Sequence, residues 1–186
     1  MSFEWMPVWG WYIVSSVLAL LLLAGAYFGG RAAYRRIARR YLIGIVGHRE
    51  GILASQRTLE AILRHLADED DEQLEYFAAH PDDADRKALV EVTRRMEIAR
   101  EELDTMPLLR SLQAPATALA DAAHIIAAEA GRVGESTDSE AVFSALAEVD
   151  VARAAEASVA ADAMVNEVSE RFDLDEAAVY GGGLYI

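Results

Sequence analysis

Between Trp5 and Gly30 the chain carries no charged side chain, and residues 8–28 are rich in Val, Leu, Ile and Ala. As a helix, those residues would be about 31 Å long, close to the roughly 30 Å thickness of a bilayer's hydrocarbon core. Aromatic rings favour the two lipid–water interfaces, and here they flank the run as Trp5, Trp9, Trp11 and Tyr12 on one side and Tyr27, Phe28 and Tyr34 on the other. We therefore predict a transmembrane anchor within residues 1–30.

A cleaved secretory signal is the alternative interpretation of this run, because Ala24-Gly25-Ala26 places small residues at the spacing of a cleavage site. The first seven residues contain no Lys or Arg, whereas a signal peptide begins with a basic region. The apolar run is also longer than the usual core of a signal peptide. We expect the segment to be retained.

The basic residues that follow the run predict its direction in the membrane. Glu4 is the only charged side chain before the run, and five arginines come directly after it: Arg31, Arg35, Arg36, Arg39 and Arg40. Positive charge stays on the cytoplasmic side, so we expect the N-terminus outside and the remaining chain in the cytoplasm. Each arginine near an anionic lipid surface contributes about 1 kcal/mol, so membrane lipid is an expected partner. Specific lipid recognition is the alternative to a purely orienting role.

Two glycines near the inner end of the run, Gly25 and Gly29, form a G-x-x-x-G pair. Such a pair lets two membrane helices approach closely and is a candidate helix–helix contact, consistent with a homo-oligomer. Glycine is also common in membrane helices without this role, so the pair alone does not establish association.

Charge is distributed unevenly along the chain and excludes one class of partner. Residues 1–66 hold eight arginines and three acidic residues, whereas residues 67–186 hold nine basic and 28 acidic residues. So acidic a region repels phosphate groups, and we expect no nucleic-acid partner. The chain has no cysteine, which removes disulfides, thiolate metal sites and cysteine nucleophiles.

The spacing of apolar residues beyond the arginines predicts an all-α fold, with an antiparallel helical bundle following the single transmembrane helix. In residues 31–66, a basic neck leads into an amphipathic helix whose stripe alternates by three and four residues: Ile45, His48, Ile52, Ser55, Leu59, Ile62 and Leu66. Gly44, Gly47 and Gly51 fall in this helix, and each costs about 1 kcal/mol relative to alanine. They indicate either a flexible joint or a close helix contact.

Residues 67–172 form the predicted acidic bundle, in which prolines and acidic residues mark the helix boundaries. The pattern predicts a short helix over residues 73–79, a new helix from Asp82 or Asp83, breaks at Pro107 and Pro115, and one last helix over residues 140–172. Short turns between successive helices favour an antiparallel arrangement.

No stretch of the chain carries the signature of a known reaction. The four histidines, His48, His65, His80 and His124, form no H-E-x-x-H motif, and the pair Asp121 and His124 supplies only two of the ligands that a metal needs. We therefore expect no catalytic residue, no metal site and no cofactor. An enzyme with a site inside the bundle is the least favoured hypothesis.

The C-terminal tail, residues 173–186, combines a glycine-rich linker with an apolar end. Gly181, Gly182 and Gly183 separate Tyr180 from Leu184, Tyr185 and Ile186. A disordered tail is usually polar, so we expect Tyr180 and the last three residues to be covered, either by this chain's own bundle or by a partner that binds the tail.

These features predict a single-pass protein of the cell membrane that holds an unidentified cytoplasmic or membrane protein at the bilayer through its helices. A transducer or regulatory subunit of a larger membrane complex, with Gly44–Gly51 as its joint, is the alternative. Arginine is abundant and Lys87 is the only lysine, a composition typical of GC-rich bacterial genomes.

Overall fold

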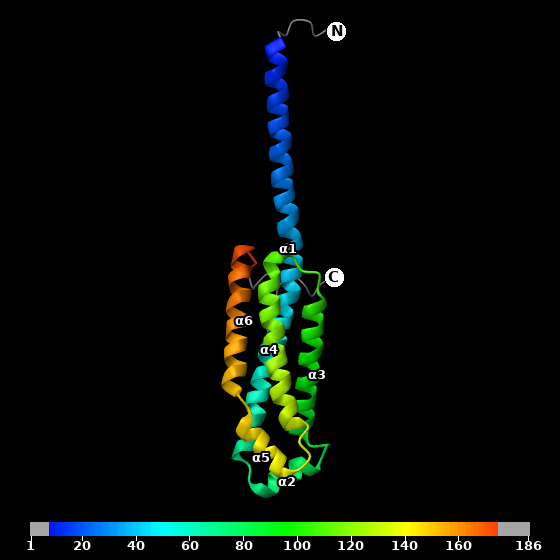
Figure 1. Ribbon diagram of the computed structural model, residues 1–186, viewed down its shortest axis with the longest axis vertical. Coiled ribbons are helices and arrows are strands. Elements are labelled where there is room, and N and C mark those ends of the chain that lie inside the picture. Colours follow the sequence, from blue (N-terminus) through cyan, green and yellow to red (C-terminus); the bar gives the residue numbers. More distant parts are fainter. Residues whose placement is uncertain (1–7, 175–186) are drawn as a thin grey trace. The chain divides into compact units, whose positions relative to one another are not determined.

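The computed structural model describes residues 8–174, and within this range it contains six α-helices and no strand (Figure 1). The helices are α1 (Val8–Asp68), α2 (Asp71–Ala79), α3 (Ala84–Thr105), α4 (Arg110–Gly134), α5 (Ser139–Glu148) and α6 (Val151–Arg171). The prediction of an all-α chain is therefore confirmed for the described residues. The chain divides into two compact units, Met1–Arg40 and Tyr41–Ile186.

In the first unit, α1 presents an apolar surface to its surroundings. The four consecutive leucines, Leu20 to Leu23, are each about two-thirds exposed, and Tyr27 and Phe28 are exposed to a similar extent. The two rings meet edge to face with their centroids 5.5 Å apart. This helix is long enough and apolar enough to cross a membrane, and it is a candidate membrane span of the kind that the sequence predicts.

In the second unit, the remainder of α1 buries the predicted stripe. Six of the seven stripe residues are buried and His48 is half-buried. The three glycines do not interrupt the helix, which continues to Asp68. A Cβ atom added at Gly44 would lie 3.7 Å from the Met106 methyl, whereas one added at Gly47 or Gly51 would have no neighbour within 4 Å among the described residues.

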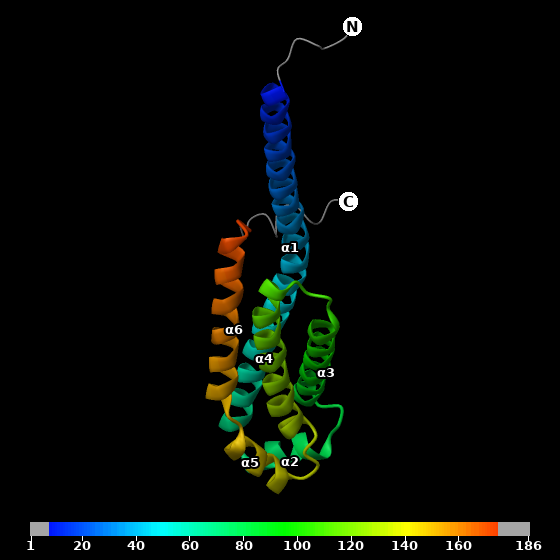
Figure 2. The same cartoon turned by 45° about the horizontal axis from the view of Figure 1, so that its top comes forward.

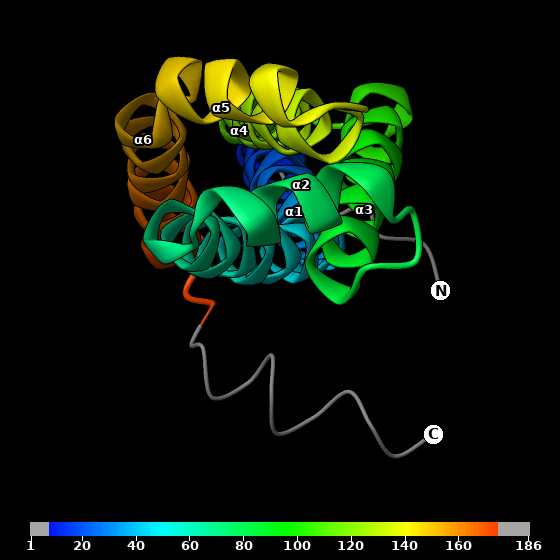
Figure 3. The ribbon, with the colours of Figure 1, turned by 90° about the horizontal axis from the view of Figure 1, so that it is seen from below.

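Helix α4 is the central element of the second unit, since it packs against α3 on one side and α6 on the other (Figure 2). Its buried face consists mainly of small residues, so neighbouring helices can approach it closely. Figure 3 shows α2 and α5 side by side at one end of this unit, where they contact each other. The fully buried side chains of the unit include Leu42, Ile45, Leu89, Leu112, Leu119, Ile126, Val142 and Val165.

Acidic residues at the N-terminal ends of several of these helices cap the free backbone N–H groups of the first turn. Asp70 accepts a hydrogen bond from the Gln73 backbone, and the Gln73 side chain accepts one in return from the Asp70 N–H, which forms a capping box. Asp83 accepts from the backbone N–H groups of Asp85 and Arg86. The prediction that a helix begins near Asp82 or Asp83 is thus confirmed, and α2 includes the predicted short helix.

The predicted break at Pro115 is wrong, because this proline lies inside α4. The helix begins earlier, at Arg110, and the break falls entirely in the turn that contains Pro107. Pro115 has no N–H to donate to the preceding turn. However, Pro115 is itself buried, between Leu112 and Leu119, which are also buried. Burial of this face stabilises the helix enough to offset one missing hydrogen bond.

The prediction of one helix over residues 140–172 is also wrong. The segment forms α5 and α6, and the chain leaves helical geometry at Val149 and Asp150. The Asp150 side chain accepts a hydrogen bond from the Arg153 backbone at 2.8 Å, so it caps a new helix. Val159 of α6 is 66% exposed, so this apolar residue is not part of the core. In α6, Asp162 forms an ion pair with Arg49 of α1.

The close approach of α4 to α3 at Gly134 gives a test of this packing. A Cβ atom added there would lie 3.1 Å from the Leu89 Cβ, which is held on the backbone of α3. We expect Gly134→Ala to lower the free energy of unfolding by about 1–3 kcal/mol, because overpacking forces α3 and α4 apart. Chemical denaturation followed by circular dichroism measures the effect.

Gly131→Ala is the matched control, because an added Cβ at that position meets Thr93 at an ordinary 3.7 Å. We expect it to be neutral or to stabilise by up to about 1 kcal/mol, from better helix propensity. Equal losses in the two variants would contradict the packing described for Gly134.

Candidate functional site

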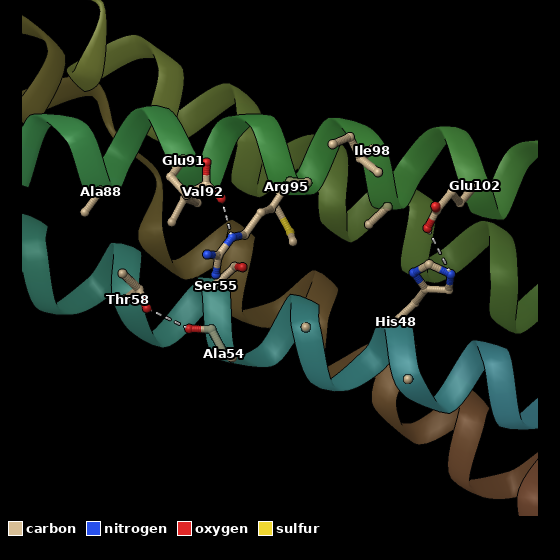
Figure 4. Close-up of a pocket in the computed structure, with 14 residues that line it drawn as sticks. His48, Ala54, Ser55, Thr58, Ala88, Glu91, Val92, Arg95, Ile98 and Glu102 are labelled. Atoms are coloured by element: carbon tan, nitrogen blue, oxygen red, sulfur yellow. Dashed lines mark hydrogen bonds and ion pairs between the residues drawn. The ribbon is translucent and has the colours of Figure 1, made fainter. Parts of the chain in front are cut away.

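A groove of about 420 Å³ lies between α1 and α3 in the second unit (Figure 4). Gly47, Gly51 and Ala54 line it from α1, and Val92, Ile98 and Ala99 line it from α3. The groove exists because α1 has no side chains at the two glycine positions, where an added Cβ would meet no described atom within 4 Å. Two helices that pack through larger side chains would leave no such space.

The surface of this groove is mostly apolar. Val92, Met96 and Ala99 of α3 are buried, whereas Ile98 at the edge is 42% exposed. A large exposed aliphatic side chain beside a hollow of this size can pack against an inserted side chain. The groove is therefore suited to apolar contact with a partner.

Charged residues stand at intervals along the groove (Figure 4). The Nε2 atom of His48 lies 3.6 Å from a carboxylate oxygen of Glu102. Further along, Glu91 accepts hydrogen bonds from Arg94 at 2.9 Å and from Arg95 at 2.7 Å. The hydrogen bonds from these two arginines hold the pKa of the Glu91 carboxyl at about 2, well below its usual 4.5.

Several residues predicted to meet the membrane interface lie on α1. Trp11 and Tyr12 are more than half exposed, as is Tyr27. The five arginines are exposed and belong to the same helix: Arg31, Arg35, Arg36, Arg39 and Arg40. Trp9 falls within α1, and Trp5 lies outside the described residues. The helix thus carries aromatic, apolar and basic segments in the predicted order.

The remaining predicted contact residues are surface positions or lie beyond the described range. Gly25 and Gly29 are exposed, and an added Cβ at either would meet no described atom within 4 Å. Their role as a helix–helix contact between copies stays a prediction. The candidate partner-binding tail falls outside the described residues: Tyr180, Leu184, Tyr185 and Ile186.

Asp121 and His124, the pair with metal-like spacing, both lie on α4. Both residues are exposed, and the Nδ1 atom of His124 lies 3.1 Å from an Arg100 nitrogen. Arginine can only donate, so it occupies the lone pair that a metal would need. Among residues 8–174, no group of three or more histidines and carboxylates is arranged to hold a metal ion.

Comparison with known proteins adds no relative: no family model matches the chain, and neither a curated protein nor a solved structure is significantly similar to it.

Sequence reasoning did not find the α1–α3 groove, although its signal was present. Gly47, Gly51 and Ala54 are small residues at spacings of four and three, and hence on one face of a helix. From the sequence, the glycines of this helix predict either a flexible joint or a close helix contact. The third outcome, an open hollow, depends on how far α3 lies from that face.

The ion pairs of Glu91 with Arg94 and Arg95 predict that the Glu91 carboxylate stays charged in mildly acidic solution. Because the pKa of Glu91 is depressed, its ion pairs stabilise the folded chain above the unfolded-state pKa near 4.5 and are lost as the pH falls through about 2. We expect the carboxyl carbon of Glu91 to titrate near pH 2 in NMR spectra. In the Arg94→Gln, Arg95→Gln double variant it should return toward 4.5. A wild-type value near 4.5 would show that these ion pairs do not form.

Proposed function

We propose that this chain is a single-pass membrane protein that tethers a partner protein to the cytoplasmic face of the bilayer. The observation that carries the proposal is the apolar surface of α1, where Leu20 to Leu23 are each about two-thirds exposed. In water, exposed hydrocarbon costs about 25 cal/mol per Å², whereas in a bilayer the same surface is favourable. A helical anchor also satisfies its own backbone hydrogen bonds.

The proposed orientation places the N-terminus outside and the later helices in the cytoplasm. It is supported by the exposed arginines of α1, which follow the apolar segment at its C-terminal side: Arg31, Arg35, Arg36, Arg39 and Arg40. Basic residues flanking a span are retained on the cytoplasmic side. In that position their guanidinium groups contact lipid phosphates. The acidic helices that follow are repelled by the same anionic surface.

We propose further that residues 41–172 form an antiparallel helical bundle that presents the α1–α3 groove to the partner. Support comes from the short connections between consecutive helices and from the packing of α4 against both α3 and α6. The occupant that fits the groove best is an α-helix of the partner. Residues 47–58 span about 16 Å along α1, which matches three turns of a docked helix with large apolar residues at i, i+4 and i+7.

Membrane insertion is tested by placing a charge in the proposed span. We expect Leu21→Arg to weaken anchoring, because arginine at the centre of a span costs about 2.5–3.5 kcal/mol or more. The measurement is the fraction of full-length protein that remains in the membrane pellet after alkaline extraction. Val159→Arg, at an equally exposed position on α6, is the matched control and should stay in the pellet. Wild-type protein found in the supernatant would reject the anchor.

Partner docking is tested by filling the groove. Gly51→Leu adds a side chain where an added Cβ meets no described atom within 4 Å, so we expect stability to be retained while the groove is blocked. A photoreactive amino acid at position 98 should crosslink in cells to one protein, and Gly51→Leu should reduce that adduct at least tenfold. The control replacement is Ala163→Leu, on the exposed surface of α6.

Two outcomes would contradict groove docking. One is an adduct at position 98 that persists in the Gly51→Leu variant. The other is an identical adduct from a photoreactive residue at position 164, which is similarly exposed on α6. Both results are independent of whether α1 spans a membrane.

A transducer is the second candidate function, favoured by the continuity of α1. The helix passes without a break through Gly44, Gly47 and Gly51, so a rotation or shift applied at one end can reach the other. A bifunctional crosslink between cysteines introduced at positions 49 and 162 would fix α1 to α6. A passive tether should bind its partner equally well with this crosslink, whereas a transducer should change its output.

A further inference from the structure

We propose that His65 is a proton-operated latch that holds the end of α1 to the start of α3 and to the turn before α2. The two ring nitrogens of this histidine face carboxylates on different segments. Nδ1 lies 2.8 Å from an oxygen of Asp85 in α3, and Nε2 lies 3.1 Å from an oxygen of Glu69, just after α1. The latch is a regulatory device separate from the proposed groove and anchor.

The chemistry of the two contacts requires a particular protonation state. An ionised carboxylate only accepts hydrogen bonds, and a neutral imidazole carries one N–H donor and one lone pair. The contact with Asp85 is a hydrogen bond, whereas the contact with Glu69 is an ion pair without hydrogen-bond geometry. Both contacts are therefore attractive together only when His65 is a positively charged imidazolium. Protonation is the condition for bridging Asp85 and Glu69 at once.

The surroundings of His65 reinforce this requirement. Asp68 at the end of α1 and Glu69 just after it are close to His65 in sequence, and Asp85 faces the ring from α3. Asp83 and Tyr76 line the same small cavity of about 150 Å³. The hydrogen bond to Asp85 is the main cause that raises the pKa of His65 above 6.5, and the nearby negative charges add to it. The ring is 63% exposed, so protons reach it directly from solvent.

Loss of the proton changes one contact more than the other. Neutral His65 keeps a single N–H. This proton stays on Nδ1, because the contact of Nδ1 with Asp85 is the shorter of the two. The Nε2 lone pair then faces the Glu69 carboxylate, and the two repel. Since Glu69 and Asp70 form the turn into α2, and Asp70 caps that helix, deprotonation releases the α1–α2 turn while the α1–α3 contact remains.

The sign of the pH dependence follows from the raised pKa. The latch contributes stability fully below the unfolded-state pKa near 6.5, and this contribution is lost as the pH rises through the folded-state value. The α1–α2 turn is therefore closed in mildly acidic conditions and open in alkaline ones. Any partner that contacts this end of the second unit would bind in a pH-dependent manner.

The test is an NMR titration of the full-length chain in uncharged detergent micelles, with selectively labelled histidine. We expect His65 to titrate above 6.5 and, above its pKa, to adopt the neutral form protonated at Nδ1 rather than the commoner form protonated at Nε2. Amide hydrogen exchange at residues 69–71 should become faster over the same pH range, after correction for intrinsic exchange.

Glu69→Gln should lower the pKa of His65 and remove the pH dependence of exchange at residues 69–71. Glu75→Gln, which makes the same charge change at an exposed position on α2, is the control and should leave both nearly unchanged. A His65 pKa at or below 6.5 would overturn the proposal. So would Nε2 protonation in the neutral form, or equal effects of the two glutamate variants.

Discussion

The constraint on which the structure depends is that α1 is one continuous helix with three different surfaces in succession. Its first part exposes hydrocarbon, a short basic part follows, and the part after Tyr41 buries a stripe from Ile45 to Leu66. Each surface is favourable in a different medium: a bilayer core, an anionic interface and a protein interior. Within the second unit, the other helices pack together with the last of these surfaces, whose stripe is buried.

Small residues have two opposite effects in this chain, and the neighbouring helix decides which one applies. Along α4 they allow close packing, as at Gly134, where an added Cβ would lie only 3.1 Å from Leu89. At Gly47 and Gly51 of α1 the neighbouring helix α3 does not close the space, and a groove of about 420 Å³ is left. A groove with a mostly apolar surface is available for contact, whereas a filled interface contributes only to stability.

The many carboxylates serve local structure more than any single site. Asp70, Asp83, Asp138 and Asp150 each cap a helix by accepting backbone hydrogen bonds, which stabilises the first turns of these helices. Others form ion pairs on the helix surface, such as Glu91 with its two arginines. At His65 two carboxylates meet one ring, and the same acidity makes that contact sensitive to pH.

The sequence by itself determined the all-α class, the apolar run of α1 and the stripe from Ile45 to Leu66, because these depend on periodicity within one helix. Tertiary structure decided that Pro115 stays helical and that the glycines of α1 border a groove. Each of these outcomes depends on contacts between segments far apart in the chain, whose free energies are comparable to or larger than the local preferences they override.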